Sequence, residues 1–324
     1  MANGELLTEL VRAHFSGEQN QFDRILNQVI ASESRIGHSQ VARRLRELRD
    51  APQDRPAKAV PLVRASRDLS EFIQIGYSDF TLDDLIVPQT IRASLQRLVI
   101  EQRQHEKLAA HGLKPRRKVL LHGPPGTGKT LTANAIAGEL KLPIARVRLE
   151  VLFSRYLGET ASTLTEVFAE ASRLRAVYLF DEFDALASQR TSAGDVGEIR
   201  RIVGTFLQLL DADASDSIFV AATNIAGQVD SALFRRFDDV IEYEVPTLEE
   251  RSVLVQRTLR GSRLGKNQIL ELSTVADTLS LADLAAALNE SRKASVLSGE
   301  SQVTEVRARE AILQRVARII PQMK

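Results

Sequence analysis

Residues 123–130 read GPPGTGKT, and this stretch decides the fold. It follows the apolar run KVLLHG at 118–123 and precedes the helical run LTANAIAGEL at 131–140. Glycines in such a loop let backbone N–H groups wrap a phosphate, and the helix N-terminus adds a favourable dipole. Lys129 can then bridge β- and γ-phosphates, while the Thr130 hydroxyl ligates Mg²⁺. The motif therefore predicts a site for ATP and Mg²⁺. Its expected nucleotide contacts are Gly123, Pro124, Pro125, Gly126, Thr127, Gly128, Lys129, Thr130 and Leu131.

Four more short runs of β-branched and apolar residues surround this motif. They are PIARVRL (143–149), AVYLFD (176–181), SIFVAAT (217–223) and VIEYEV (240–245), with helical patterns between them. This alternation is typical of a parallel sheet covered on both faces. We therefore predict an α/β domain over 70–246 with a parallel five-stranded sheet. Beyond Pro246, Thr247 and Glu250 form a capping box and helical spacing continues, so residues 247–324 are predicted to be all helical.

The first 69 residues follow a different pattern. Helical periodicity recurs in three pieces between residues 5 and 49, which predicts a small helical module over 1–50. The stretch 50–69 has three prolines and no sustained period, so 51–69 reads as a linker. Four arginines on the last predicted helix form either a solvated face or a docking surface for an acidic partner.

Composition excludes several classes of protein. The 324 residues carry 43 Lys+Arg against 42 Asp+Glu, which gives no bulk field for holding nucleic acid or an anionic membrane. The absence of cysteine excludes disulfides and thiolate metal sites, and it is compatible with a reducing compartment. No stretch approaches the roughly 20 apolar residues of a membrane span. We expect a soluble, cytoplasmic protein.

Two carboxylates end the third apolar run, which continues as AVYLFDEFD. Asp181 and Glu182 thus lie at the carboxyl end of a buried strand, where open α/β sheets bind their ligands. Asp181 can hold the water shell of Mg²⁺, and Glu182 can polarise a water for in-line attack on the γ-phosphate. Acidic residues that merely end a strand are the alternative, and that alternative does not account for their place beside a phosphate loop.

GPPGTGKT and FDEFDAL (180–186) resemble, in wording and spacing, the Walker A and Walker B motifs of the AAA+ ATPases. The resemblance is to the clade that contains katanin, spastin, the proteasomal motor subunits and their bacterial relatives, and it covers residues 75 to 320. It implies ATP hydrolysis by a ring of identical subunits, with hexamers expected, and a nucleotide between the α/β core and a helical lid. ATN at 222–224 is similar to the sensor 1 motif, which implies that Asn224 positions the attacking water with Glu182.

Three other segments carry the resemblance further. DSALFRRFD (230–238) is similar to the region with the arginine fingers, which implies that Arg235 and Arg236 reach the γ-phosphate of a neighbouring subunit. The family usually separates its two arginines, so which of the adjacent pair is the finger stays open; local ion pairs with Asp238 and Asp239 are the alternative. FTLDDLIVP (80–88) resembles the adenine-reading segment, and SLADLAAAL (280–288) resembles the lid helix that faces the nucleotide. The residues implied there are Asp84, Leu85, Ile86 and Ala282.

The remaining resemblance concerns the substrate. In VLFSRYLGETAS (151–162), RYLGE is similar to a substrate-gripping pore loop, which implies Arg155, Tyr156 and Leu157 as substrate contacts. A Tyr156 packed in the domain core is the alternative. TSAGDVGEIRR (191–201) occupies the position of the family's second pore loop.

These features predict a ring-forming ATPase that remodels or unfolds proteins through a central pore. Its N-terminal module would dock the substrate or an adaptor, and a separate protease could work with it, since no HExxH zinc motif occurs. A loader-type ATPase that handles DNA is disfavoured by the balanced charge and the aromatic loop. An ATP-gated assembly scaffold is disfavoured by Glu182.

Overall fold

The computed structural model describes residues 25, 27–30, 32, 69–154, 160–183, 195–224, 234–300 and 302–319. The chain divides into two compact units, Met1–Val63 and Arg64–Lys324, and each is considered by itself. In the first unit the described residues are helical. The rest of the predicted N-terminal module and almost all of the predicted linker lie outside the described residues.

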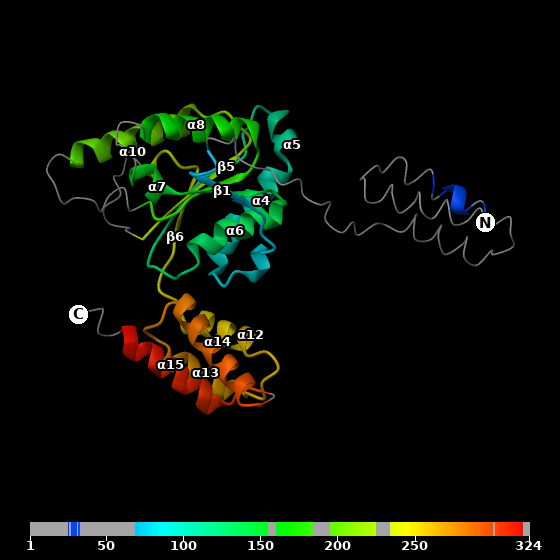
Figure 1. The fold of residues 1–324 in the computed structure, drawn as a ribbon, viewed down its shortest axis with the longest axis vertical. Coiled ribbons are helices and arrows are strands. Elements are labelled where there is room, and N and C mark those ends of the chain that lie inside the picture. The colour runs from blue at the N-terminus through cyan, green and yellow to red at the C-terminus, as the bar shows by residue number, and fades with distance from the viewer. Residues whose placement is uncertain are drawn as a thin grey trace. The chain divides into compact units, whose positions relative to one another are not determined.

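The second unit begins with a strand and ends with a group of helices (Figure 1). In chain order its elements are β1 (Ile73–Gly76), the 3-10 helix η1 (Leu82–Asp84), α4 (Gln89–Arg103), α5 (His105–Ala109), β2 (Lys118–His122), α6 (Lys129–Leu140), β3 (Ile144–Val147), α7 (Leu149–Ser154), α8 (Thr160–Arg173), β4 (Val177–Phe180), α10 (Asp195–Ala212), β5 (Ile218–Thr223), β6 (Asp239–Glu242), α12 (Leu248–Thr258), α13 (Lys266–Val275), α14 (Leu281–Leu297) and α15 (Glu305–Ile319).

The strands form one sheet in the order β1-β3-β4-β5-β2-β6. The five predicted strands are all present, and each neighbouring pair among them is parallel. The predicted number of strands is wrong by one, because β1 pairs antiparallel with β3 along the edge, with Ile73 opposite Val147. Its sequence, IQIG, is too short for a periodic signal, and the antiparallel partner that makes it a strand lies far along the chain.

Helices cover both faces of the sheet, as predicted (Figure 1). On the face of α8 and α10 the core is rich in aromatic rings: Phe168 stacks on Phe219 at 5.0 Å, and Phe180 meets Phe206 edge-on at 5.0 Å. The face of α4 and α6 has an aliphatic core that includes Leu98. Both cores hold the central strands rigidly, so the carboxyl ends of β2, β4 and β5 form a fixed edge for a ligand site.

The C-terminal helices α12–α15 pack around their own apolar core (Figure 1). The predicted capping box is confirmed: Glu250 N donates to Thr247 Oγ1 at 3.2 Å, and Thr247 N donates to Glu250 Oε2 at 2.7 Å. Within the described ranges, none of the helices is both long enough and apolar enough to cross a membrane. The helical composition of the C-terminal part thus follows from its pattern and caps.

Candidate functional site

The phosphate loop, Gly123–Thr130, connects β2 to α6 in a conformation that needs glycine. Gly123 and Gly126 have φ angles of 138° and 74°, which side chains rarely permit. A Cβ at Gly123 would overlap the carbonyl group of Tyr243, whose carbon would be 2.8 Å away. A Cβ at Gly126 would lie 2.8 Å from Cβ of Ser280. The backbone of the loop therefore runs in close contact with its surroundings on two sides.

Lys129 closes the loop from its helical end. The side chain is buried, and its Nζ donates hydrogen bonds to the carbonyl oxygens of Gly123 at 2.8 Å and Pro124 at 2.7 Å. The ammonium group is therefore held across the loop, with its charge beside the backbone N–H groups at the start of α6. Both features favour an anion there.

Asp181 joins the carboxyl end of β4 to the first turn of α6. Its Oδ2 accepts a hydrogen bond of 2.6 Å from Thr130 Oγ1, and its Oδ1 accepts one of 3.0 Å from Glu182 N. These contacts place a hydroxyl and a carboxylate side by side. They are oxygen ligands of the kind that Mg²⁺ prefers.

Glu182 has an unusual backbone conformation, with φ of 52°. Left-handed φ angles are uncommon outside glycine and cluster at functional sites. The next residue, Phe183, is buried in the aromatic core, and its N–H donates to Ala222 O at 2.8 Å. The burial of Phe183 and its bond to β5 therefore hold the turn that leaves Glu182 exposed at the end of β4.

A cavity of about 470 Å³ brings these segments together. It is lined by Asp84, Leu85, Ile86, Val87, Pro125, Gly126, Thr127, Gly128, Lys129, Thr130, Leu131, Asp181, Glu182, Asn224, Leu281, Ala282 and Ala285. The volume lies within the range of small-molecule sites, about 300–1,000 Å³. Ala282 N donates to Gly126 O at 3.1 Å, so α14 contacts the loop directly.

Most of the predicted nucleotide contacts line this cavity, with two exceptions. Gly123 is buried behind it against Tyr243, and Pro124 contributes its carbonyl to Lys129. Val87, Leu281 and Ala285 line the cavity although they were not predicted as contacts. They lie in the segments 80–88 and 280–288, which the sequence analysis assigned to the nucleotide site, so membership of those segments could have identified them.

The segment before α4 is fixed by an arginine. Arg92 donates to Leu82 O at 2.9 Å and to Leu85 O at 2.7 Å. The Asp84 carboxylate accepts from Thr81 N at 2.7 Å, which caps η1. These bonds fix the backbone of the segment that borders the cavity.

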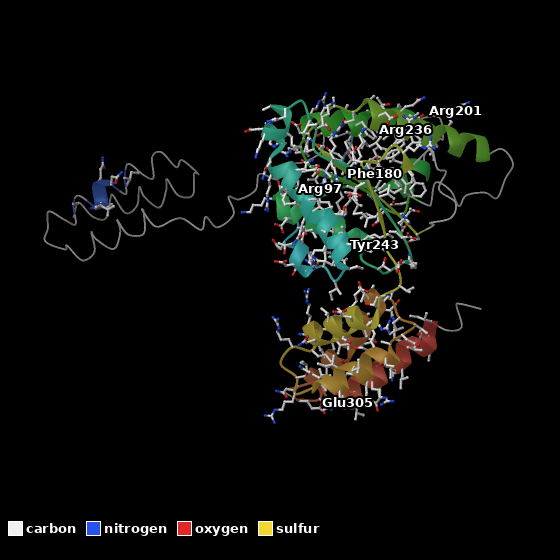
Figure 2. All side chains as sticks on the ribbon, turned by 180° about the vertical axis from the view of Figure 1, so that it is seen from behind. Arg97, Phe180, Arg201, Arg236, Tyr243 and Glu305 are labelled. Carbon is white, nitrogen blue, oxygen red and sulfur yellow. The ribbon has the colours of Figure 1, made fainter. Side chains whose placement is uncertain are left out.

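The two arginines predicted as fingers do not line the cavity. Arg236 forms an ion pair with Asp211 at the end of α10, whereas Arg235 is exposed and has no ion pair with any described residue. Figure 2 shows Arg236 among the side chains of the α/β part. Phe234 just before them packs edge-on against His122, with ring centroids 5.7 Å apart.

The predicted alternative, local pairing with Asp238 and Asp239, is not found. Asp238 Oδ2 accepts from Arg117 N at 2.9 Å and Lys118 N at 3.0 Å. Asp239 pairs with Arg116 at 3.0 Å. Both carboxylates thus tie β6 to the start of β2 and do not hold the predicted fingers.

The pore-loop predictions fall largely outside this description. Arg155, Tyr156 and Leu157 lie within 155–159, which is outside the described residues. Of the second predicted loop, residues 191–194 also lie outside. Residues 195–201 belong to α10, so the prediction of a loop there is wrong. Glycine at the start of this segment suggested a loop, but the apolar spacing that follows favours a helix.

Comparisons with known proteins point to one family. The family model described as "ATPase family associated with various cellular activities (AAA)" matches residues 119–245. The uncharacterised AAA family ATPase y4kL of Sinorhizobium fredii is 36% identical over 250 residues, which cover 76% of this chain and 75% of that protein. The proteasome-activating nucleotidase of Aeropyrum pernix is 33% identical over 258 residues, or 77% of this chain.

This chain spans 62% of that nucleotidase, less than two thirds of its length. Among solved structures, the FIGL-1 AAA domain has the same fold, with a TM-score of 0.60 and 24% identity over 77% of this chain and 91% of that one. The phosphate loop, the acidic strand end and the matched relatives lead to one conclusion: the chain belongs to the AAA family of ATPases.

Proposed function

We propose that this ATPase forms a ring, expected to be a homo-hexamer, and couples ATP hydrolysis to the remodelling or unfolding of proteins through a central pore. The observation that supports its chemistry most directly is the single cavity shared by the phosphate loop, Asp181, Glu182 and Asn224. A phosphate cradle, a metal-binding carboxylate and a group that orients water are the parts that phosphoryl transfer needs.

The lining of the cavity supports a site for Mg²⁺ beside the triphosphate. Thr130 and Asp181 would hold the ion, because their oxygens already lie 2.6 Å apart at the mouth of the loop. Bound Mg²⁺ would neutralise charge on the β- and γ-phosphate oxygens. Lys129 places a further positive charge on the same phosphates.

Glu182 and Asn224 act on the attacking water in this proposal. Glu182 accepts its proton, and Asn224 orients it from the end of the neighbouring strand β5. The adenine would be read by the backbone of Asp84–Ile86, and Ala282 lines the same cavity. The left-handed turn at Glu182 supports the assignment, since strain of this kind is retained where function needs it.

The arginines would act on the site of a neighbouring subunit. Arg235 is exposed and forms no ion pair with the described residues, which suits it to reach across an interface, whereas Arg236 is paired with Asp211 of its own chain. We therefore assign Arg235 as the finger and Arg236 as the residue that positions it. Phe234, just before these arginines, makes an edge contact with His122, the residue before the phosphate loop, which supports a link between this segment and the chain's own nucleotide site.

The handling of substrate rests on the predicted pore loop with Arg155, Tyr156 and Leu157. The relation to proteasome-activating nucleotidases is consistent with protein as the substrate. In the proposed organisation, residues 1–50 dock substrate or adaptor, 51–69 link, 70–246 bind ATP, and 247–324 form the lid. The basic run at 114–118 offers little to nucleic acid, because Arg116 and Arg117 are paired with Asp239 and Asp213.

A substrate trap tests the proposal. Glu182→Gln should retain ATP and hold substrate in the ring, so that a pull-down in ATP recovers proteins that an ADP control does not. Deleting residues 1–50 from the trap should remove these proteins if the module docks them. Recovery of nucleic acid alone, or of the same proteins in ADP, would contradict protein remodelling.

A further inference from the structure

Two buried hydroxyl groups lie behind the phosphate loop and have no role in the proposed chemistry. Tyr243 follows β6, and Thr132 lies in the first turn of α6; their side chains are almost completely buried. The two oxygens are 2.5 Å apart. Figure 2 shows Tyr243 at the end of the α/β part from which the chain continues into α12.

The hydrogen bonds around this pair have one consistent direction. Thr132 Oγ1 donates to Gly128 O at 3.1 Å. A hydroxyl carries a single hydrogen, so the hydrogen between the two side chains comes from Tyr243. Burial raises the pKa of Tyr243 to about 12, although the hydrogen bond with Thr132 opposes this rise. The phenol is therefore protonated at neutral pH and can donate.

The Gly128 carbonyl decides where a neighbouring N–H points. It accepts hydrogen bonds from Thr132 N at 2.8 Å and from Thr132 Oγ1. The carbonyl of Gly128 and the N–H of Lys129 belong to one planar trans peptide and point in opposite directions. Holding the carbonyl toward α6 therefore turns the Lys129 N–H out of the helix N-terminus, toward the place of the phosphates.

Tyr243 also contacts the other end of the loop. Its N–H donates to His122 O at 2.7 Å, directly before Gly123, and its carbonyl lies against Gly123. The backbone of Tyr243 thus supports the start of the loop, and its hydroxyl acts through Thr132 on the end.

We propose that Tyr243 is a positioning residue of the nucleotide site, which acts through Thr132 to orient the Gly128–Lys129 peptide toward the β-phosphate. This inference rests on the proposed role of the loop as the phosphate cradle. Because Tyr243 is buried and is not among the residues that line the cavity with Glu182 and Asn224, it should affect nucleotide affinity and leave the hydrolytic step to those two residues.

Tyr243→Phe removes the hydroxyl and keeps the ring that fills the core. Calorimetric titration with ADP should show a Kd raised about three- to tenfold, the range of one hydrogen bond, and KM for ATP should rise equally. The kcat should stay within about twofold of the parent. Tyr178→Phe is the matched control: it removes a buried hydroxyl that donates to Leu174 O at 3.3 Å, near the amino end of β4 and in the core on the other face of the sheet. It should leave the ADP affinity unchanged.

The route through Thr132 is tested in a second background. Thr132→Val should weaken ADP binding by itself, and adding Tyr243→Phe to it should change the Kd by less than about 1.5-fold. The inference would be overturned if the increases in Kd of the two single variants multiplied in the double variant. It would also be overturned if Tyr243→Phe bound ADP with the parental Kd. Lys129→Ala distinguishes failure of this inference from failure of the proposed nucleotide site. If Lys129→Ala binds ADP as tightly as the parent, the loop is not the phosphate cradle. If Lys129→Ala loses ADP binding and Tyr243→Phe keeps the parental Kd, only the role of Tyr243 is refuted.

Discussion

Replacing Gly126 by alanine tests how closely α14 lies against the phosphate loop. Because φ at Gly126 is 74°, backbone strain in the alanine variant should lower the free energy of unfolding by about 1–2 kcal/mol. Its Cβ would also lie 2.8 Å from Cβ of Ser280 and 3.3 Å from Cβ of Ala282. Ser280 is not free to move, because its Oγ caps α14: it accepts from Asp283 N at 3.1 Å and donates to Asp283 Oδ2 at 2.6 Å.

The structure sets the size of the effect. If Ser280 is displaced, α14 loses its cap, which costs about 1 kcal/mol. The hydrogen bond from Ala282 N to Gly126 O should break as well, at a cost of about 1 kcal/mol. The cap and this hydrogen bond hold the start of α14 against the phosphate loop where the two line the cavity, so the loss of about 2 kcal/mol beyond the strain falls on the arrangement that binds ADP. The Kd for ADP should therefore rise about thirtyfold.

Calorimetric titration with ADP and thermal melting, measured on the same preparations, distinguish loss of the contact between α14 and the loop from backbone strain alone. Gly112→Ala is the control for strain, because Gly112 has φ of 71° with nothing within 4 Å of the added Cβ. It should lower the melting temperature and leave ADP affinity unchanged. Adding Ser280→Gly to Gly126→Ala should recover about tenfold in affinity, because glycine costs an N-cap only a few tenths of a kcal/mol. If Gly126→Ala bound ADP with the parental affinity and melted at the same temperature as Gly112→Ala, the close contact between α14 and the phosphate loop would be refuted.

Three further predictions concern turnover and substrate. Glu182→Gln should bind ATP normally and release phosphate at least ~10²-fold more slowly, since it loses the base and keeps the metal ligands; normal phosphate release would assign the water to another group. Arg235→Ala should lose ATP turnover and keep ATP binding, and mixing it with Glu182→Gln should restore activity at interfaces that join an intact Glu182 to an intact Arg235. Arg236→Ala should keep more turnover than Arg235→Ala, and the reverse order would exchange the assignments of the two arginines. Tyr156→Ala should leave basal ATPase within about twofold while remodelling of a protein substrate falls at least tenfold, equivalent to roughly 1.4 kcal/mol; parallel loss of ATPase, remodelling and thermal stability would identify a core tyrosine.

Much of the nucleotide site could be predicted because its signals are local. The glycines, Lys129 and Thr130 lie within eight consecutive residues, and their spacing is a consequence of how a backbone wraps a phosphate. The parallel strands and the Thr247 capping box were likewise predicted, because periodicity and capping depend on residues only a few positions apart.

The tertiary structure alone decided which distant residues meet. The strand β1 forms because it pairs with β3. Arg236 forms an ion pair with Asp211, whereas the sequence suggested its nearer neighbours Asp238 and Asp239. Hydrophobic periodicity reports that a side chain is buried, but it does not report what lies against it. For the same reason the hydroxyl pair of Thr132 and Tyr243 had no signal in the sequence: each residue satisfies its local pattern, and their contact depends on β6 returning beside β2.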